Sequence, residues 1–310
     1  MARAASQARH PFLTRSRKEG LFFFIFISPW IAGFLIFLAG PIIASFYFSL
    51  TTYDVLNPPT FIGLQNYRDL TSDDLFWQSL RVTTEYSLIS VPLGIAFALG
   101  LAILLNLKIP FIAFFRTIYY LPSVISGVAV AVLWMWILNP AFGILNWALW
   151  NFLHIRGPQW LFSEQWALPS LVLMSLWSVG GSMILYLAGL QGVPTELYEA
   201  ASLDGAHAVR RFWHITLPGI SPVLLFTLIT GIINSFQTFT QASVMTQGGP
   251  HYATFFYVYY LWQTAFGGST IDMGYASAMA WILFVLVFLL TILLLVSSRL
   301  WVYYEGAERG

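Results

Sequence analysis

At Glu199 the chain reads Glu-Ala-Ala-Ser-Leu-Asp-Gly as far as Gly205, and nine residues later it reads Ile-Thr-Leu-Pro from Ile215 to Pro218. This is the longest charged interruption between two hydrophobic segments in the second half of the chain. The flanking segments are long and apolar enough to cross a bilayer. The stretch therefore predicts a polar connection at a membrane surface, between two transmembrane helices.

The connection has the sequence features of a short helix. Thr195 follows a proline and is a suitable N-cap residue, with Glu196 and Glu199 in the expected first turn, where the helix dipole favours anions. Small residues after Glu199 would let the helix fit closely into a groove on another protein, with its acidic groups facing basic ones at the rim. The alternative is an ordinary surface helix whose charges face water.

Composition places the whole chain in a membrane. Of its 310 residues, 58% are hydrophobic and only 9% are charged, against about 25% charged in an average soluble protein. The length suits one bundle rather than two domains. The chain has no cysteine, which excludes a disulfide framework, a thiolate metal site and a cysteine nucleophile.

The chain offers six segments near the length of about 20 apolar residues that a membrane-crossing helix needs. These segments are residues 21–50, 81–107, 117–138, 165–190, 218–247 and 273–298. The sequence therefore predicts an all-α, polytopic membrane helical bundle with six transmembrane helices. The stretch His251–Ser269 is short and rich in Tyr and Trp, which favour the membrane–water interface. We expect an interfacial helix there, outside the bilayer core, and not a seventh span.

Lysines and arginines predict the orientation, because they concentrate in cytoplasmic connections. They gather in the N-terminal tail, in the turn after the second span, in the connection that contains Glu199 and at the C-terminus. Both termini and this connection are therefore expected in the cytoplasm. The domain boundaries follow: a basic tail at residues 1–20, a transmembrane domain at 21–300 with the polar connection at 191–217, and a C-terminal tail at 301–310.

Polar side chains inside the spans are candidates for a substrate path, because they are unfavourable in lipid unless they face a cavity or a partner. In the fifth span, Asn234, Thr238 and Gln241 recur at helical spacing beside Phe236 and Phe239. Amides can bond sugar hydroxyls, and aromatic rings can stack on the apolar face of a pyranose. The alternative is that these residues hold neighbouring helices together. The further candidates are Ser235 and Gln237 in the fifth span and Trp177, Ser178 and Gly181 in the fourth.

The pattern Glu-Ala-Ala, three residues, Gly, nine residues, Ile-x-Leu-Pro resembles the EAA loop of ATP-binding-cassette (ABC) importer permeases, and the chain fits it at every fixed position. Three other segments resemble the carbohydrate branch of this superfamily, in particular its maltose-type, F-like subunit. They are Phe61–Tyr67 (Phe-Ile-Gly-Leu-Gln-Asn-Tyr), the Gly248-Gly249-Pro250 turn and Gly274–Ala278. Together they extend the resemblance from the first span to the sixth.

The resemblance implies a type I importer fold and a set of partners. These are a second, G-like permease subunit, two ATP-binding-cassette ATPase subunits and an extracytoplasmic substrate-binding protein, in the lipid of a bacterial or archaeal cytoplasmic membrane; no nucleic-acid partner is expected. It also implies a coupling helix that lies in a cleft of the ATPase and includes Glu199, Ala200, Ala201, Asp204 and Gly205. In such permeases the segment before the Gly-Gly-Pro turn lines the sugar site.

The chain is not expected to be an enzyme or to hold a cofactor. A Walker A loop needs Gly directly before Lys, whereas the lysines here follow Arg17 and Leu107. The five histidines are scattered and predict no metal site. We therefore expect a sugar importer permease, most simply for a di- or oligosaccharide. Glycerol-3-phosphate or another polyol is an alternative substrate.

Two rival classes make different demands on the chain. An ion-coupled secondary transporter would need a membrane carboxylate or broken helices at the midplane, and the interiors of the last four spans contain no acid. A membrane-embedded enzyme would need a nucleophile–base pair or a metal cluster, and the sequence offers neither.

Overall fold

A computed structural model describes residues 12–107, 109–267 and 271–303. Most of the described chain is helical, and its strands form a short antiparallel ribbon of β1 (Thr51–Thr52) and β2 (Thr60–Phe61). The predicted all-α membrane bundle is confirmed. Residues 1–11 of the expected N-terminal tail, 304–310 of the C-terminal tail and the end of the His251–Ser269 segment lie outside the described residues.

Three of the expected spans are long helices. The first combines α1 (Phe12–Phe34), a π-helical turn (Leu35–Ala39) and α2 (Gly40–Ser49), and its apolar part is Phe22–Ser49. The other two are α4 (Asp74–Leu105) and α15 (Met273–Trp301). The helix α4 begins where the carboxylate of Asp73 accepts a hydrogen bond from the Leu75 amide at 2.9 Å, a standard N-cap.

The other three spans are bent pairs of shorter helices, and six crossings result if each pair is one span. The pair α5 (Ile112–Tyr120, extended by a 3-10 turn, Leu121–Val124) and α6 (Gly127–Ile137) bends by 101°. The pair α8 (Glu164–Trp177) and α9 (Gly180–Gly192) bends by 49°. The third pair runs from α11 (Ala208–Arg211) through α12 (Leu217–Gly219) to α13 (Ser221–Phe236) and bends by 68°.

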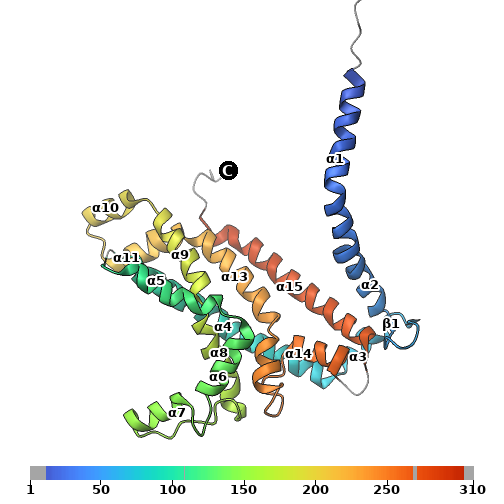
Figure 1. The fold of residues 1–310 in the computed structure, drawn as a ribbon. Helices are drawn as coiled ribbons and strands as arrows, with labels where there is room; N and C mark the ends of the chain where they lie inside the picture. The colour runs from blue at the N-terminus through green and yellow to red at the C-terminus, as the bar shows by residue number, and fades with distance from the viewer. Residues whose placement is uncertain (1–11, 108, 268–270, 304–310) are drawn as a thin grey trace, which may run out of the picture.

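Short elements connect these spans. They are α3 (Gln65–Thr71), α7 (Ile144–Ala148), α10 (Thr195–Leu203), α14 (Tyr257–Trp262) and π-helical turns at Leu149–Leu153, Phe212–Thr216, Ala242–Thr246 and Gln263–Gly267. Figure 1 shows α10, the start of α1 and the end of α15 toward one side of the molecule, and α3, α7 and α14 toward the other. The first and last described helices therefore begin and end on the same side as α10 (Figure 1), and the orientation of the termini stays a prediction.

The core is organised around α4, which contacts α8, α9, α13 and α14. The first span lies apart: α1 projects away from the other helices, whereas α2 packs on α15 (Figure 1). An apolar window of 18 residues in this span has no residue buried in the isolated chain. The cavity described below therefore lies within the bundle that surrounds α4.

The segment His251–Ser269 contains the helix α14, which continues into the π-helical turn Gln263–Gly267. This described helix is too short to cross a bilayer. Its aromatic side chains do not all face outward. Tyr257 is 0% exposed, its amide donates to Thr83 Oγ1 at 2.9 Å and its hydroxyl donates to the Met279 carbonyl at 2.8 Å. Part of the tyrosine-rich composition therefore serves packing between α4 and α15, and the position of the segment at the membrane–water interface stays a prediction.

Candidate functional site

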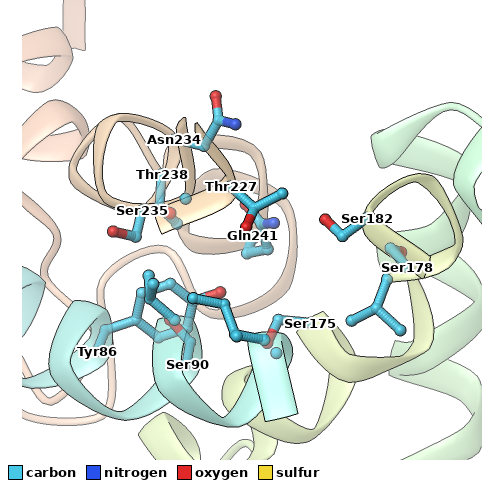
Figure 2. A pocket seen from close by; sticks show the side chains of 15 residues that line it. Tyr86, Ser90, Ser175, Ser178, Ser182, Thr227, Asn234, Ser235, Thr238 and Gln241 are labelled. Atoms are coloured by element: carbon cyan, nitrogen blue, oxygen red, sulfur yellow. The ribbon is translucent and has the colours of Figure 1, made fainter. Parts of the chain in front are cut away.

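A cavity of about 260 Å³ lies between α4, the α8–α9 pair and α13. Its polar walls consist of hydroxyl and amide side chains, and the residues that line it include no acidic or basic one. Figure 2 shows these side chains: Tyr86 and Ser90 from α4; Ser175, Ser178 and Ser182 from the α8–α9 pair; Thr227, Asn234 and Ser235 from α13; and Thr238 and Gln241 beyond it. Such a surface can exchange hydrogen bonds with an uncharged polar molecule.

Five of the predicted path residues meet at this cavity and three do not. Asn234, Ser235, Thr238, Gln241 and Ser178 line it.

The other three lie elsewhere. The Gln237 side chain lines a separate, largely apolar cavity whose other lining residues belong to α14 and α15. Trp177 packs edge-on against Trp134, with ring centroids 6.1 Å apart. Gly181 is on α9 but is not part of the lining. Thus most of the fifth-span candidates line the cavity, whereas Ser178 alone does so among the fourth-span candidates.

The predicted helical face is interrupted. The helix α13 ends at Phe236 and Gln237 is its C-cap residue, so Asn234 and Gln241 are not on one continuous helix. Thr238 follows in non-helical backbone and is buried. The side chains still converge because the chain turns at the helix end and resumes near Gln241. Spacing therefore selected residues that line this cavity, although the continuous helix that it assumed is wrong.

Ser235 combines the two alternatives left open by the sequence. Its hydroxyl donates to Ser87 Oγ on α4 at 2.7 Å, which holds α13 against α4. Asn234, one residue earlier, is exposed at the cavity rim, and its amide points away from Tyr86 and Ser90 (Figure 2). Ser235 therefore contributes both to interhelical bonding and to the cavity wall, whereas Asn234 contributes to the cavity rim.

Sequence reasoning missed several lining residues, namely Tyr86, Ser90, Ser175 and Thr227. A signal existed for some of them. Tyr86 and Ser90 are four residues apart on α4, and Ser175, Ser178 and Ser182 follow at three and seven residues, close to one helical face. Thr227 gave the same kind of signal, because it precedes Asn234 by seven residues. Its hydroxyl also donates to the Val223 carbonyl at 3.0 Å, as hydroxyls in apolar helices commonly do.

The charged connection forms the exposed helix α10. Asp204 is its C-cap residue, and Gly205 follows with φ +75°, in the left-handed region. The Ala206 amide donates to the Ala201 carbonyl at 2.9 Å and the Gly205 amide to the Ser202 carbonyl at 3.1 Å, which together form a Schellman motif. Nothing lies within 4 Å of a Cβ added at Gly205. In this chain the glycine is therefore required by backbone geometry and not by close packing.

The start of α10 differs from the prediction. The helix begins at Thr195 with Pro194 as its N-cap residue, and no side chain caps it. Glu196 is in the first turn, but Glu199 lies one turn further on. A proline before the helix fixes the entry of the chain and takes the place that Thr195 was expected to fill.

The outer surface of α10 is free of other parts of the chain. Glu199, Ala200 and Asp204 are exposed, Ala201 is half-buried and the Leu203 side chain is 89% exposed. Within the described residues, neither acid forms an ion pair. The helix therefore presents charge together with an apolar side chain, as a surface that meets another protein does.

The inner surface of α10 is tied to two transmembrane helices. Val193, just before α10, is buried in a cluster that includes Leu190 of α9 and Ile220, which precedes α13. The Tyr198 hydroxyl is 3.0 Å from Thr216 Oγ1 in the segment that leads into α12. Since α9 and α13 both line the cavity, a displacement of α10 would reach two of its walls.

A second polar cluster holds the opposite end of the bundle. Asp73 Oδ2 accepts hydrogen bonds from the hydroxyls of Tyr260 at 2.6 Å and Tyr275 at 2.7 Å. These contacts join the start of α4 to α14 and α15. Burial of the Tyr260 hydroxyl, together with its bond to Asp73, raises its pKa above the ordinary value. We call Asp73, Tyr260 and Tyr275 the tyrosine clasp.

Comparison with known proteins agrees with these features. A family model described as "Binding-protein-dependent transport system inner membrane component" matches residues 90–304. The chain is 44% identical over 297 residues to the probable ABC transporter permease protein YesP of Bacillus subtilis (strain 168), which covers 94% of this chain and 95% of that protein. It is 33% identical to the trehalose/maltose transport system permease protein MalF of Thermococcus litoralis, over 91% of this chain and 95% of that protein.

A solved structure has a similar fold. It belongs to a bacterial ABC transporter involved in the import of the acidic polysaccharide alginate, with a TM-score of 0.79 and 25% sequence identity. The match covers 93% of this chain and 98% of that one. The bent helices and the exposed α10 are thus found in a chain whose overall fold is that of a transporter subunit.

Proposed function

Because the chain belongs to the family of binding-protein-dependent transport system inner membrane components, it is a permease component of an ABC transporter, and we propose that it imports an uncharged sugar. A di- or oligosaccharide suits the site best. The sugar would be delivered by an extracytoplasmic binding protein and would pass through the cavity beside α4. ATP would be hydrolysed on two separate ATPase subunits, and a second, G-like permease would complete the path.

The observation that carries this proposal is the chemistry of the cavity wall. Hydroxyls and amides from three sides can replace the water around sugar hydroxyls, and no ionised group among the lining residues attracts or repels a neutral substrate. The similarity to a permease described as a trehalose/maltose subunit supports the same substrate class. Asn234 at the exposed rim would face the second permease, so that the two subunits together enclose the sugar.

Glycerol-3-phosphate is the main alternative substrate. A phosphate is normally held by arginine, lysine or several backbone amides, and the cavity lining has no basic side chain. The second permease or the binding protein would then have to supply the cation. The described part of this chain favours the neutral sugar.

Ion-coupled secondary transporters are the rival class, and helix geometry does not separate them from ABC permeases in this chain. Broken helices are one mark of that class, and this chain contains three bent helix pairs, each of which forms one span in the six-span arrangement. Bent helices therefore do not distinguish the two classes in this chain. The family match, together with the similarity to ABC permeases over almost the whole chain, distinguishes the two classes in favour of an ABC permease.

We propose α10 as the coupling helix. Its exposed acids and Leu203 would enter a cleft of one ATPase, with Glu199 and Asp204 facing basic groups at the rim. Closure of the ATPases on ATP would push α10, and Val193 and the Tyr198–Thr216 contact would carry the movement to α9 and α13. The cavity would then alternate between outward and inward access. In this arrangement α10 and both termini lie on the cytoplasmic side.

The proposal is tested by purifying the tagged chain from its native membrane in mild detergent. We expect mass spectrometry to identify a second permease and an ATPase that contains a Walker A motif, and native mass spectrometry of the associated binding protein to find a neutral sugar. A phosphorylated or acidic ligand on the binding protein would overturn the substrate class. A chain that purifies without an ATPase and still transports would overturn the function.

A further inference from the structure

The connection between α6 and α8 contains a helix that exposes large apolar side chains. The helix α7 and the π-helical turn after it run without interruption from Ile144 to Leu153. Ile144, Trp147 and Trp150 recur three residues apart along one side and are all exposed, Trp147 by 58% and Trp150 by 51%. A soluble protein buries such a stripe and turns polar residues outward. This exposed side, with Phe152 and Leu153 at its end, is called the aromatic stripe.

The other side of this helix is fixed to the protein. Leu145 packs on the main hydrophobic cluster. Asn146 accepts a hydrogen bond from Trp160 Nε1 at 2.6 Å, and its own amide donates to the carbonyls of Pro140 at 3.2 Å and Pro158 at 3.3 Å. Rotation of the helix to bury the aromatic stripe would break these bonds. The outward direction of the stripe is therefore built into the fold.

The turn into the helix is equally constrained. The Asn139 side chain accepts hydrogen bonds from the amides of Ala141 at 2.9 Å and Phe142 at 3.3 Å. A Cβ added at Gly143 would lie 2.4 Å from the Asn139 carbonyl oxygen, so the chain can turn this tightly only with glycine. The helix is thus directed sideways from the end of α6, as Figure 1 shows for α7.

The charges of this connection are suited to a lipid surface. From residue 139 to residue 163 there is no acid, and Arg156 is the sole Lys or Arg. Trp is enriched at the level of lipid headgroups, where its ring contacts the acyl boundary and its N–H reaches water. The aromatic stripe also continues from the apolar surface of α6, where Val132 and Trp136 are exposed.

We propose that the helix Ile144–Leu153 lies in the lipid headgroup region of the leaflet on the side opposite α10, and that it anchors the bend between α6 and α8 to the membrane surface. Its aromatic stripe faces the acyl boundary, at a depth of about 5–10 Å. Arg156 lies near lipid phosphates. The anchor holds the start of α8, near Glu164, at a fixed height in the bilayer. Ser175 of the cavity wall is in the last turn of the same helix.

The chain contains no cysteine, so a single spin label can be placed on the aromatic stripe. Trp147→Cys and Trp150→Cys remove exposed side chains, and Gln159→Cys is a matched exposed position in the same connection. Each variant is assembled with its partner subunits, any cysteines of which are replaced. The complex is reconstituted in nanodiscs of phosphatidylethanolamine and phosphatidylglycerol. Accessibility to oxygen, which concentrates in lipid, is compared with accessibility to a water-soluble nickel chelate.

We expect the ratio of oxygen to nickel accessibility at positions 147 and 150 to be several-fold higher than at position 159. An equal ratio at the three positions would place the helix in water and overturn the proposal. Protection from both reagents would place it against protein. If such protection occurs only after the binding protein is added, the aromatic stripe is a docking surface for that protein and not a lipid anchor.

Discussion

The helix α10 and the cavity beside α4 are two candidate binding regions that differ in exposure, charge and continuity in sequence. The surface of α10 is continuous in sequence and carries Glu199 and Asp204 in the open. The cavity is uncharged and takes its walls from residues as far apart as Tyr86 and Gln241. Charge at an exposed surface is stabilised by water until a partner arrives, whereas an unpaired charge inside the membrane is strongly unfavourable. The difference is the basis for our proposal that α10 binds a protein and that the cavity binds a neutral solute.

The largest expected effect comes from the end of α10. Gly205→Val places a branched side chain at φ +75°, at a local cost of about 1–2 kcal/mol, and disturbs the Schellman motif that ends the helix. We expect ATP-driven uptake to fall about tenfold or more, because the helix no longer fits its partner. Uptake by proteoliposomes and the amount of copurified ATPase are the measurements.

The matched control for this variant is Gly100→Ala in α4, where an added Cβ meets nothing within 4 Å and φ is not positive. It should transport normally. Normal uptake by Gly205→Val as well would mean that the shape of α10 does not matter for coupling.

Charge reversal on α10 should have the next largest effect. Glu199→Lys changes an exposed side chain without an ion pair among the described residues, so the free energy of unfolding should change little. Transport should fall several-fold, because a lysine would face the basic groups of the ATPase. Glu199→Gln should have an intermediate effect. A reversal that lowers thermal stability but not the transport rate per folded complex would contradict the assignment.

Substitutions in the cavity should change substrate preference more than overall rate. Asn234→Leu and Thr238→Val each remove a possible hydrogen bond, worth about 1 kcal/mol or roughly a fivefold change in apparent affinity. Competition between labelled and unlabelled sugars measures the effect. Ser87→Ala is the matched control, because it breaks the 2.7 Å bond from Ser235 without touching the cavity. Ser87→Ala should lower stability and leave the substrate preference unchanged. If Asn234→Leu and Thr238→Val instead lower stability without changing the preference, Asn234 and Thr238 are packing elements.

The tyrosine clasp should affect stability and should have the smallest effect on transport. Asp73→Asn weakens the acceptor of two tyrosine hydroxyls, and we expect a loss of about 1–3 kcal/mol. Because the pKa of Tyr260 is raised on folding, its contribution is full below the unfolded pKa of about 10 and is lost as pH rises through the folded value. The unfolding temperature of the parent protein should therefore fall as the pH rises above about 10. The same fall should be smaller in Tyr260→Phe.

The same contrast explains what the sequence could predict. The position of α10 followed from a fixed spacing within twenty residues, and its glycine from the same pattern. The cavity depended on helices that come together only on folding, so the helical spacing of Tyr86 and Ser90 could not show that they face the fifth-span residues. Asn234 and Thr238 were found because periodicity is local, although the end of α13 at Phe236 was not foreseen.

Two other features were beyond local reasoning because they depend on packing. The bend between α8 and α9 occurs where Gly180 approaches the backbone of Tyr119 so closely that an added Cβ would be 2.5 Å from its carbonyl oxygen. The tyrosines of α14 had the composition of an interfacial helix, but Tyr257 is enclosed by α4 and α15. Composition indicates which surroundings a side chain tolerates, and only the fold decides which of them it meets.

The most direct test of the central claim is the energy source of transport. The complete complex is reconstituted in proteoliposomes with its binding protein, and sugar uptake is measured with ATP on the ATPase side or with an imposed sodium or proton gradient. We predict uptake that requires ATP and the binding protein, is insensitive to either gradient and is lost in Gly205→Val. Uptake driven by an ion gradient without ATP would contradict the account.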